Sequence, residues 1–457
     1  MLRFVFLVAA VCSSLLVSPL VVHAQELTLE EAIESTLARY PTLAAQRSAL
    51  EALRANAEVL RDNRMPNVRL HNQVTMGTAN GMSGSYFSLG LIVPTSGARR
   101  ADNRMDLATG NIALASADWE VINFGRFRAE DDLLRTDIAV GEASVATEQF
   151  RLRQAVVATY LDALRLGQFM TLEAVNVARI DTARFIITNL VRNGIKPGLD
   201  SSLASVALSR AKLSYLRVRE QHQEAITQLA TLTGRTEGTL RIDTTLRLDA
   251  LPTPGLVPPL PHPLLLFQER QIAREQAEIT LLRKAALPRV SLLAAAWGRG
   301  SSLTVENNFG PLGSGLGYTR SNFLLGVATT VNLMDFRRVA SRTRLQNYRV
   351  QEATSRLMVE RLQLQNVLNA ADSVLAVLRL ELTELPLALR SARAAYSQRL
   401  ALYNNGLENI LGLTDALQVL TTVEKEYAET RNRALRVWLQ RADATNDYTD
   451  FFGLFRR

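Results

Sequence analysis

Two long stretches of the chain have the hydrophobic periodicity of a coiled coil. In residues 337–405, apolar positions recur at alternating steps of four and three, the spacing of a heptad seam. This seam comprises Leu364, Leu368, Ala371, Leu375, Leu378, Leu382 and Leu385. A weaker seam in residues 126–193 comprises Leu152, Val156, Thr159, Ala163, Leu166 and Met170. Each stretch predicts a helix about 100 Å long at 1.5 Å per residue, with interruptions expected at Gly141, Gly167 and Pro386.

Shorter segments alternate between apolar and polar residues, as strands with one apolar face do. The apolar members are Val68, Leu70, Val74 and Met76 in one segment and Phe323, Leu325, Val327, Val331 and Leu333 in another. We expect four strands, at about residues 67–78, 111–122, 288–297 and 322–333, and Tyr86–Val93 is a candidate for a further strand. At about ten to twelve residues, such strands have the length that crosses a bilayer in a β-barrel.

Four strands are too few to close a barrel on their own. The smallest spanning barrels have about eight strands, and an open sheet edge in lipid leaves backbone groups unpaired. After the N-terminal segment, no stretch reaches about 18 consecutive apolar residues, so no membrane-spanning helix is predicted. If this chain forms a membrane barrel, the barrel must therefore be shared between copies.

The sequence contains an internal duplication. Tyr40-Pro41 and His262-Pro263 each open a helical segment that leads to a later proline, and Asn193-Gly194 recurs as Asn405-Gly406. We therefore predict two structural repeats, residues 25–233 and 264–457, each with a helix, a strand pair and a long helical hairpin. The hairpins are expected at about residues 126–233 and 337–447. Residues 234–263 between the repeats are rich in proline, which favours extended backbone, and are interpreted as a linker.

The N-terminus has the pattern of a secretory signal peptide, residues 1–24. Arg3 precedes an apolar run from Phe4 to about Leu16, and Ala24 ends a short segment typical of a cleavage site. The mature chain then begins near Gln25, outside the cytoplasm. The only cysteine, Cys12, lies in the signal, so neither a disulfide framework nor a thiolate site is expected in the mature chain.

Composition and charge narrow the possible functions. The formal net charge is +8, but acidic residues are interspersed with the arginines, which is typical of solvated helix faces and argues against nucleic-acid binding. His71, His222 and His262 never occur at ligand spacing, so we expect no metal site. A glycine-rich run has no following lysine and is interpreted as a loop; it contains Gly310, Gly313, Gly315 and Gly317. We therefore expect no catalytic residues, no cofactor and no enzymatic activity.

Three motifs, in this order, make the chain similar to a known family. They are Leu27-Thr28-Leu29-Glu30-Glu31-Ala32-Ile33 followed by Tyr40-Pro41, the turn Asn123-Phe124-Gly125-Arg126, and Tyr403-Asn404-Asn405-Gly406. With the duplication, they resemble the outer-membrane efflux protein (TolC) family over essentially the whole mature chain. The resemblance implies an α+β membrane protein that forms a homotrimeric duct. Its twelve-stranded β-barrel, four strands per chain, would lie in outer-membrane lipid and continue as a long α-helical coiled-coil barrel in the periplasm.

The same resemblance implies a function and partners. The chain would be the outer-membrane channel component of a tripartite efflux or type I secretion system. It would act as a passive conduit from a periplasmic adaptor (membrane fusion) protein and an inner-membrane pump to the exterior. The sequence does not distinguish drugs, metal ions and proteins as the cargo, because specificity lies mainly in the pump.

The helix tips are the site that the resemblance identifies. Asn193-Gly194 and Asn405-Gly406 would form the tip turns, and Asp200, Asp415, Tyr403 and Glu408 would form the periplasmic aperture and gate. In some relatives the aromatic at Tyr403 bonds the residue at Asp200, and a relative carries an arginine of the gate lock where this chain has Glu408. Arg192 or Lys196 could take that arginine's place. Turn and cap chemistry is the alternative interpretation of the two aspartates.

Two other functions are compatible with an exported, helix-rich chain. A periplasmic coiled-coil adaptor or scaffold protein is the first, although such a protein normally has one hairpin and an inner-membrane anchor. A secreted enzyme is the second, and the absence of a catalytic constellation argues against it. Outer-membrane location and a trimeric state would distinguish the channel from both.

Overall fold

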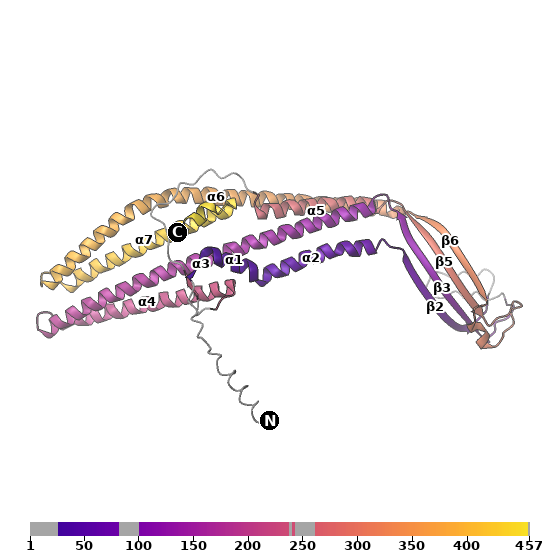
Figure 1. Ribbon diagram of the computed structural model, residues 1–457, viewed down its shortest axis with the longest axis horizontal. Coiled ribbons are helices and arrows are strands. Elements are labelled where there is room, and N and C mark those ends of the chain that lie inside the picture. The colour runs from indigo at the N-terminus through magenta and orange to yellow at the C-terminus, as the bar shows by residue number, and fades with distance from the viewer. Residues whose placement is uncertain (1–25, 82–99, 237–239, 243–260, 456–457) are drawn as a thin grey trace, which may run out of the picture. The chain divides into compact units, whose positions relative to one another are not determined.

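The computed structural model describes residues 26–81, 100–236, 240–242 and 261–455 (Figure 1). The predicted signal peptide, the candidate strand Tyr86–Val93 and most of the predicted linker lie outside the described residues.

The described chain runs through two similar series of elements. The first comprises β1 (Glu26–Leu27), α1 (Leu29–Arg39), α2 (Pro41–Asp62), β2 (Asn67–Thr78), β3 (Leu107–Ile122), α3 (Arg126–Arg192) and α4 (Gly198–Thr233). The second comprises β4 (Arg241–Ile242), α5 (Pro263–Ala285), β5 (Arg289–Ser301), the 3-10 helix η2 (Leu312–Leu316), β6 (Arg320–Thr330), α6 (Leu333–Asn404), α7 (Ile410–Thr445) and α8 (Thr449–Gly453). Pro41 and Pro263 each occupy the first position of a helix, where the missing N–H is harmless.

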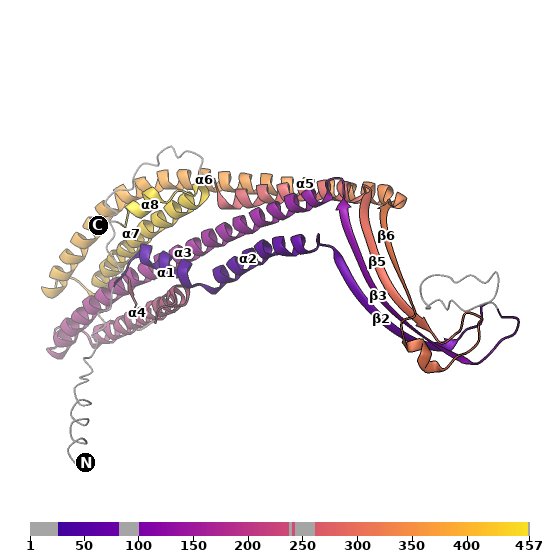
Figure 2. The same cartoon turned by 45° about the vertical axis from the view of Figure 1, so that its right-hand side comes forward.

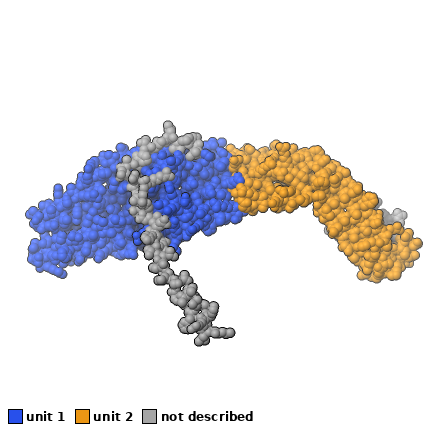
Figure 3. Space-filling model, in the orientation of Figure 1, with its two compact units in different colours: residues 1–49, 142–269, 355–457 blue, residues 50–141, 270–354 orange. Residues whose placement is uncertain are grey.

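The chain divides into two compact units that do not coincide with the two series (Figure 3). Unit 1 contains residues 1–49, 142–269 and 355–457, and unit 2 contains residues 50–141 and 270–354. Each unit therefore draws residues from both predicted repeats. A repeat cannot bury its apolar surface alone, and it does so against the corresponding part of the other repeat.

The main core of unit 1 is a layer of long-helix residues. It joins the middle of α3, the end of α4, the middle of α6 and the end of α7, and its largest fully buried members include Trp438, Tyr160 and Leu375. The β1 strand is fixed to this core, because it pairs in parallel with β4 and the Tyr160 hydroxyl donates to the Leu27 carbonyl at 3.1 Å. The Thr28 hydroxyl caps α1 by accepting from the Glu31 N–H at 3.2 Å.

The helical seam read from the sequence of α6 faces this core. Ala371, Leu375 and Leu378 are buried, and the other seam residues of α6 are half-buried. The expected interruptions are absent, since α3 runs through Gly141 and Gly167 and α6 runs through Pro386. The glycines serve close packing instead. A Cβ on Gly141 would lie 3.0 Å from Leu53, and one on Gly167 would lie 3.5 Å from the His222 ring.

Unit 2 contains the four-stranded antiparallel sheet, in the order β2-β3-β5-β6 (Figure 2). The expectation of four strands per chain is confirmed. Their limits differ slightly: β3 begins at Leu107 and not near 111, and β6 ends at Thr330 because Leu333 already begins α6. β2 and β6 are the edge strands, and within the described chain no further strand pairs with the outer edge of either one.

The strand register sorts the side chains of the sheet onto two contrasting faces. Successive residues of a strand point to opposite sides, and Val68 pairs with Ala117, which pairs with Ala294, which pairs with Leu325. This side of the four strands carries no charged residue, and we name it the uncharged face. It includes Val68, Leu70, Val74, Met76, Ala113, Ala115, Ala117, Leu292, Ala294, Ala296, Phe323, Leu325 and Val327. The opposite, charged face includes Arg69, His71, Asp118, Glu120, Arg299 and Arg320.

Candidate functional site at the helix tips

The two helical hairpins of unit 1 end in turns of the same design (Figure 1). Gly194 follows α3 with φ +73°, and Gly406 follows α6 with φ +76°. The next N–H reaches back to the helix in both, from Ile195 to the Leu190 carbonyl and from Leu407 to the Leu402 carbonyl, each at 2.9 Å. This is a Schellman-type ending, in which glycine adopts the left-handed conformation without steric cost. Asn193 and Asn405 immediately precede these glycines.

A small second core, which we name the tip core, holds the tips of the two hairpins together. Its buried members come from all four helices and are Ile187, Ala204, Tyr403, Ile410 and Leu413. Tyr403 is fully buried, and its hydroxyl has no hydrogen-bond partner among the described residues. Burial raises the pKa of Tyr403, and the nearby Asp200 carboxylate raises it further. The bond between Tyr403 and Asp200 that the resemblance implies is thus not formed in this protomer.

Lys196 connects the first tip to the second. Its Nζ donates to the backbone carbonyl of Glu408 at 3.1 Å and lies 5.3 Å from the centre of the Tyr403 ring. A cation over an aromatic face is attracted by the ring quadrupole. The single lysine in the α3–α4 turn therefore contacts both the turn and the last turn of helix in the other hairpin.

Glu408 is held by its own hairpin. Its carboxylate forms an ion pair with Arg399 of α6 and accepts from the Asn409 N–H at 3.0 Å. These two interactions, the backbone N–H first, lower the pKa of Glu408. The Asn409 side chain in turn caps α7 by accepting from the Gly412 N–H at 2.9 Å. The ion-pair partner of Glu408 in this protomer is thus Arg399, not Arg192 or Lys196.

The two tip aspartates occupy different environments. Asp200 is half-buried in the first turn of α4, where the helix dipole favours a carboxylate. Its N–H donates to the Pro197 carbonyl at 3.1 Å. Asp415 is exposed on α7. The two aspartates therefore differ in their exposure and in their position along a helix.

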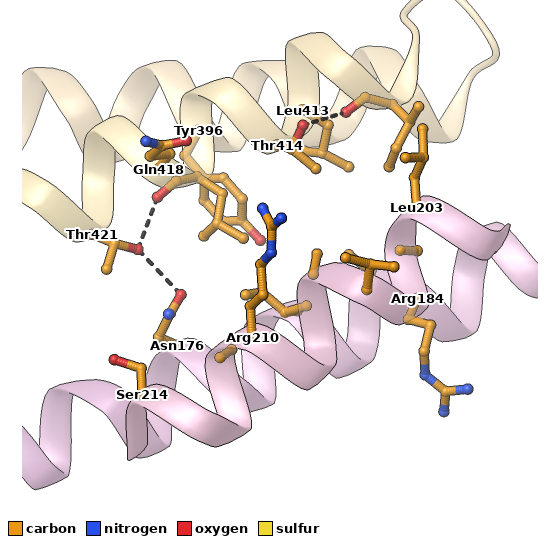
Figure 4. Close-up of a pocket in the computed structure, with 18 of the residues that line it drawn as sticks. Asn176, Arg184, Leu203, Arg210, Ser214, Tyr396, Leu413, Thr414, Gln418 and Thr421 are labelled. Atoms are coloured by element: carbon orange, nitrogen blue, oxygen red, sulfur yellow. Dashed lines mark hydrogen bonds between the residues drawn. The ribbon is translucent and has the colours of Figure 1, made fainter. Parts of the chain in front are cut away.

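A cleft of about 560 Å³ opens between the hairpins next to the tip core (Figure 4). Arg210 of α4 and Tyr396 of α6 reach into it from opposite hairpins. Its walls mix apolar residues such as Leu413 with polar ones, and Thr421 of α7 donates across it to the Asn176 side chain of α3 at 3.1 Å. The cleft is therefore amphipathic and opens between the two hairpins.

A layer of charged pairs separates the tip core from the main core. Arg179 of α3 pairs with Glu424 of α7, and Lys425 of α7 pairs with the buried Glu173 of α3 at 2.5 Å. Ser214 of α4 also donates to Glu173, at 2.7 Å. Sequence reasoning missed this layer, because charged residues on a long helix ordinarily lie on its solvated face. No local pattern distinguishes these four from their exposed neighbours.

No other chemistry gathers in the described residues. His71 lies on the charged face of the sheet, His222 lies against Gly167, and His262 lies beside Asp443. Within the described ranges, no group of three or more His, Cys, Asp or Glu side chains is arranged to hold a metal ion. None of the described helices combines the length and the apolar character needed to cross a bilayer.

Comparison with known proteins agrees with this architecture. The family described as outer membrane efflux protein matches residues 32–235 and 261–444. The solved outer-membrane channel OprN is 19 % identical, and the alignment covers 92 % of this chain and 90 % of that chain with a TM-score of 0.71. No curated protein sequence shows significant similarity to the chain.

Two further solved structures share the fold. The outer membrane protein VceC from Vibrio cholerae is 15 % identical over 91 % of this chain and 95 % of that chain, with a TM-score of 0.70. The CmeC outer membrane channel of Campylobacter jejuni is 13 % identical over 92 % of this chain and 85 % of that chain, with a TM-score of 0.73. The two matched segments follow the duplication and cover most of the chain, and the chain therefore belongs to the outer membrane efflux protein family, as an outer-membrane channel component of efflux systems.

Proposed function

We propose that the protein works as a homotrimer in which three sheets close into one barrel across the outer membrane. The uncharged face of the sheet carries this proposal. Lipid-facing side chains of a spanning barrel are apolar and alternate with polar lumen residues, which is the division between the uncharged and charged faces. The unpaired edges of β2 and β6 require neighbours, because an open edge in lipid leaves backbone hydrogen bonds unmade.

The helical hairpins then form the periplasmic part of a passive conduit. An inner-membrane pump would deliver cargo to it, and a periplasmic adaptor protein would bind the hairpin tips. The cleft between the hairpins supports the adaptor contact, since it is open, amphipathic and lined by long helices against which another helix can pack. A chain that is itself an adaptor has no use for a membrane-length sheet with one uncharged face.

The tip residues would form the aperture of this conduit. Asp200 and Asp415 would meet their counterparts from the other two protomers around the axis. Tyr403, Glu408 and the two Asn-Gly turns would fix the closed position of each tip. The burial of Tyr403 and the Lys196 bridge support this role, because both connect the two hairpins of one protomer at their ends.

The experiment is a planar-bilayer recording on purified protein, combined with chemical cross-linking in detergent. Discrete conductance steps and a cross-linking ladder that ends at three chains are expected. A monodisperse monomer without conductance would refute the shared barrel. The genes adjacent to the one that encodes this chain would then separate efflux from type I secretion through the class of pump.

A further inference from the structure

The segment between β5 and β6 folds back over the sheet, on the uncharged face. We name residues 302–319 the collar; it contains η2, which Figures 1 and 2 both show beside the far ends of the strands. The Thr109 hydroxyl donates to the Leu312 carbonyl, and the Asn111 side chain donates to the Leu316 carbonyl at 2.8 Å. Thr109 and Asn111 belong to the uncharged face by register. The collar therefore lies on the side of the sheet that would face lipid, not on the lumen side.

Glycines make this close approach possible. A Cβ on Gly300 would lie 1.7 Å from the Gly317 carbonyl oxygen, and a Cβ on Gly315 would lie 2.3 Å from the Thr109 hydroxyl. The Tyr318 ring also packs on Gly298 of β5. A Cβ on Gly298 would lie 3.4 Å from an atom of this ring. Three glycines of the strand and the collar thus provide the seat. Real side chains at Gly300 or Gly315 would lift the collar off the sheet.

The second half of the collar, residues 311–318, covers a polar surface with a largely apolar one, whereas Thr304, Glu306 and Asn307 of its first half are polar and exposed. Beneath it lie Thr109, Asn111 and bare glycine backbone, and Asn111 is buried by the contact. The exposed side chains of the collar include Leu312, Leu316 and Tyr318, which are 43 %, 50 % and 54 % exposed. In the same rungs of the sheet, Val74 pairs with Asn111 and Met76 pairs with Thr109, and both apolar side chains are exposed on the uncharged face. The collar therefore continues the apolar surface of β2 across β3 and β5.

Several polar groups between the collar and the sheet are paired, although the Asn111 Oδ1 atom is buried without a hydrogen-bond partner among the described residues. The Leu312 and Leu316 carbonyls accept from Thr109 and Asn111, and the Gly310 N–H donates to the Ser302 carbonyl at 2.8 Å. Pairing matters here because an apolar layer offers no water to satisfy an unpaired backbone group. Tyr318 adds an aromatic ring with a hydroxyl directed to Asn72 at 3.5 Å, and such rings concentrate at membrane–water boundaries.

From these observations we propose that the collar is a membrane anchor that seats against the boundary between headgroups and acyl chains of the outer leaflet. Leu312, Leu316 and Tyr318 are the inserted side chains, and the lipid surface is the partner. This proposal rests on the proposed function, because it takes the uncharged face to be the lipid-facing side of the sheet. It assigns a lipid contact to a loop that the sequence pattern alone describes only as glycine-rich.

The test uses single-cysteine variants, which the chain favours because Cys12 is its only cysteine and lies in the predicted signal. Leu316→Cys probes the collar, Leu325→Cys probes the middle of the uncharged face, and Asn322→Cys probes the charged face. Each is labelled with an environment-sensitive fluorophore in phosphatidylcholine proteoliposomes. Quenching is measured with nitroxide lipids labelled near the headgroup or near the chain end, and with aqueous iodide. We expect headgroup-level lipid quenching at 316, deep lipid quenching at 325, and iodide quenching alone at 322.

The pattern of failure separates the two proposals. Iodide quenching alone at 316, with lipid quenching kept at 325, overturns the collar proposal and leaves the barrel intact. Absence of lipid quenching at 325 overturns the proposed function itself.

A second pair of variants, on the labelled Leu316→Cys background, tests whether the glycines hold the collar against the sheet. Gly300→Ala should shift the probe from lipid to iodide quenching, whereas Gly317→Ala, which has open space at its Cβ position, should not. Equal behaviour of the two variants contradicts the seat.

Discussion

Arg179 of α3 donates two hydrogen bonds, of 2.7 and 3.1 Å, to the buried carboxylate of Glu424 on α7. The next residue of α7, Lys425, pairs with Glu173 on α3, so the charges are reversed between the two pairs. Sliding α7 along α3 would bring like charges or unpaired charges together. The layer therefore fixes the axial register of one hairpin against the other between the main core and the tip core.

Removing one member of the Arg179–Glu424 pair should destabilise unit 1. Among the described residues, Arg179→Met leaves the buried Glu424 carboxylate with one remaining ion pair, to the Arg393 guanidinium at 3.6 Å. Breaking a buried pair costs about 3–5 kcal/mol, and we expect a loss near the lower end in urea unfolding of the detergent-solubilised protein. Arg184→Met, which removes an exposed pair with Asp181 on the same helix, should cost about 0.5 kcal/mol or less. Adding Glu424→Leu to Arg179→Met should recover most of the loss, and a double variant as unstable as the single one would contradict this explanation.

The seam of α6 gives a second prediction. Leu375→Asp places a carboxylate in a packed layer where the leucine is fully buried, which costs several kcal/mol if the group stays ionised. We expect that this variant does not assemble. The measurement is the yield of the oligomer in the outer-membrane fraction. Leu380→Asp on the same helix is the control, because Leu380 is 69 % exposed in the protomer. Normal assembly of the Leu375 variant would show that the buried layer tolerates charge.

His262 makes the stability of unit 1 depend on pH. Its Nε2 donates to the Asp443 carbonyl at 2.9 Å, and its Nδ1 accepts from the Leu264 N–H at 3.2 Å, which requires the neutral ring. Burial lowers the pKa of His262. The folded state therefore binds the proton less readily than the unfolded state. The stability that neutral His262 contributes is complete above the ordinary histidine pKa of about 6.5. This stability is lost as the pH falls from there toward the lower pKa that His262 has in the folded state.

The measurement is the urea unfolding free energy between about pH 7 and pH 5, for the native protein and for His262→Gln. We expect a smaller decrease on acidification in the variant. His222→Gln is the companion variant, because burial also lowers the pKa of His222. If His262→Gln has the same pH slope as the native protein, the imidazole makes no linked contribution.

The tip aspartates give a prediction about conduction that rests on the proposed trimer. Six carboxylates would gather around one axis, and at a spacing of about 8 Å and an effective dielectric near 20 each pair would repel by roughly 2 kcal/mol. Such a ring attracts cations. The double variant Asp200→Asn with Asp415→Asn should reduce cation selectivity, measured as reversal potential, and weaken block by multivalent cations from the periplasmic side. Unchanged selectivity and block would leave the aspartates as turn residues and make Glu408 the next candidate.

Much of the fold was predictable because its signals are local and periodic. The heptad seam of α6, the alternation in β2 and β6 and the Asn-Gly turns each depend on residues close in sequence. The duplication added long-range order, since it placed the same elements twice in the same succession. The helix breaks expected at Gly141, Gly167 and Pro386 were wrong, because tertiary packing overrides weak local preferences in a helix of this length.

The tip site was likewise predictable from the sequence only in part. The sequence and its family resemblance brought attention to Asp200, Asp415, Tyr403 and Glu408. Only the structure paired Glu408 with Arg399, buried the Tyr403 ring beside Lys196 and left Asp415 exposed while Asp200 is half-buried. The Glu408–Arg399 pair joins a turn to the helix before it, and the Lys196–Tyr403 contact joins a turn to a helix of the other hairpin. Their formation depends on how the helices rotate and slide against each other, which no sequence pattern specifies.

The sequence by itself determined the elements, their order, their repetition and the family, because hydrophobic periodicity and turn residues specify local backbone structure. The tertiary structure alone decided which charges are buried together in the Arg179–Glu424 layer and on which face of the sheet the collar lies. The physical reason is that a charged residue on a long helix, or a glycine in a loop, has no preferred partner until packing brings a distant segment within a few ångströms. Burial and strand register then select the contact.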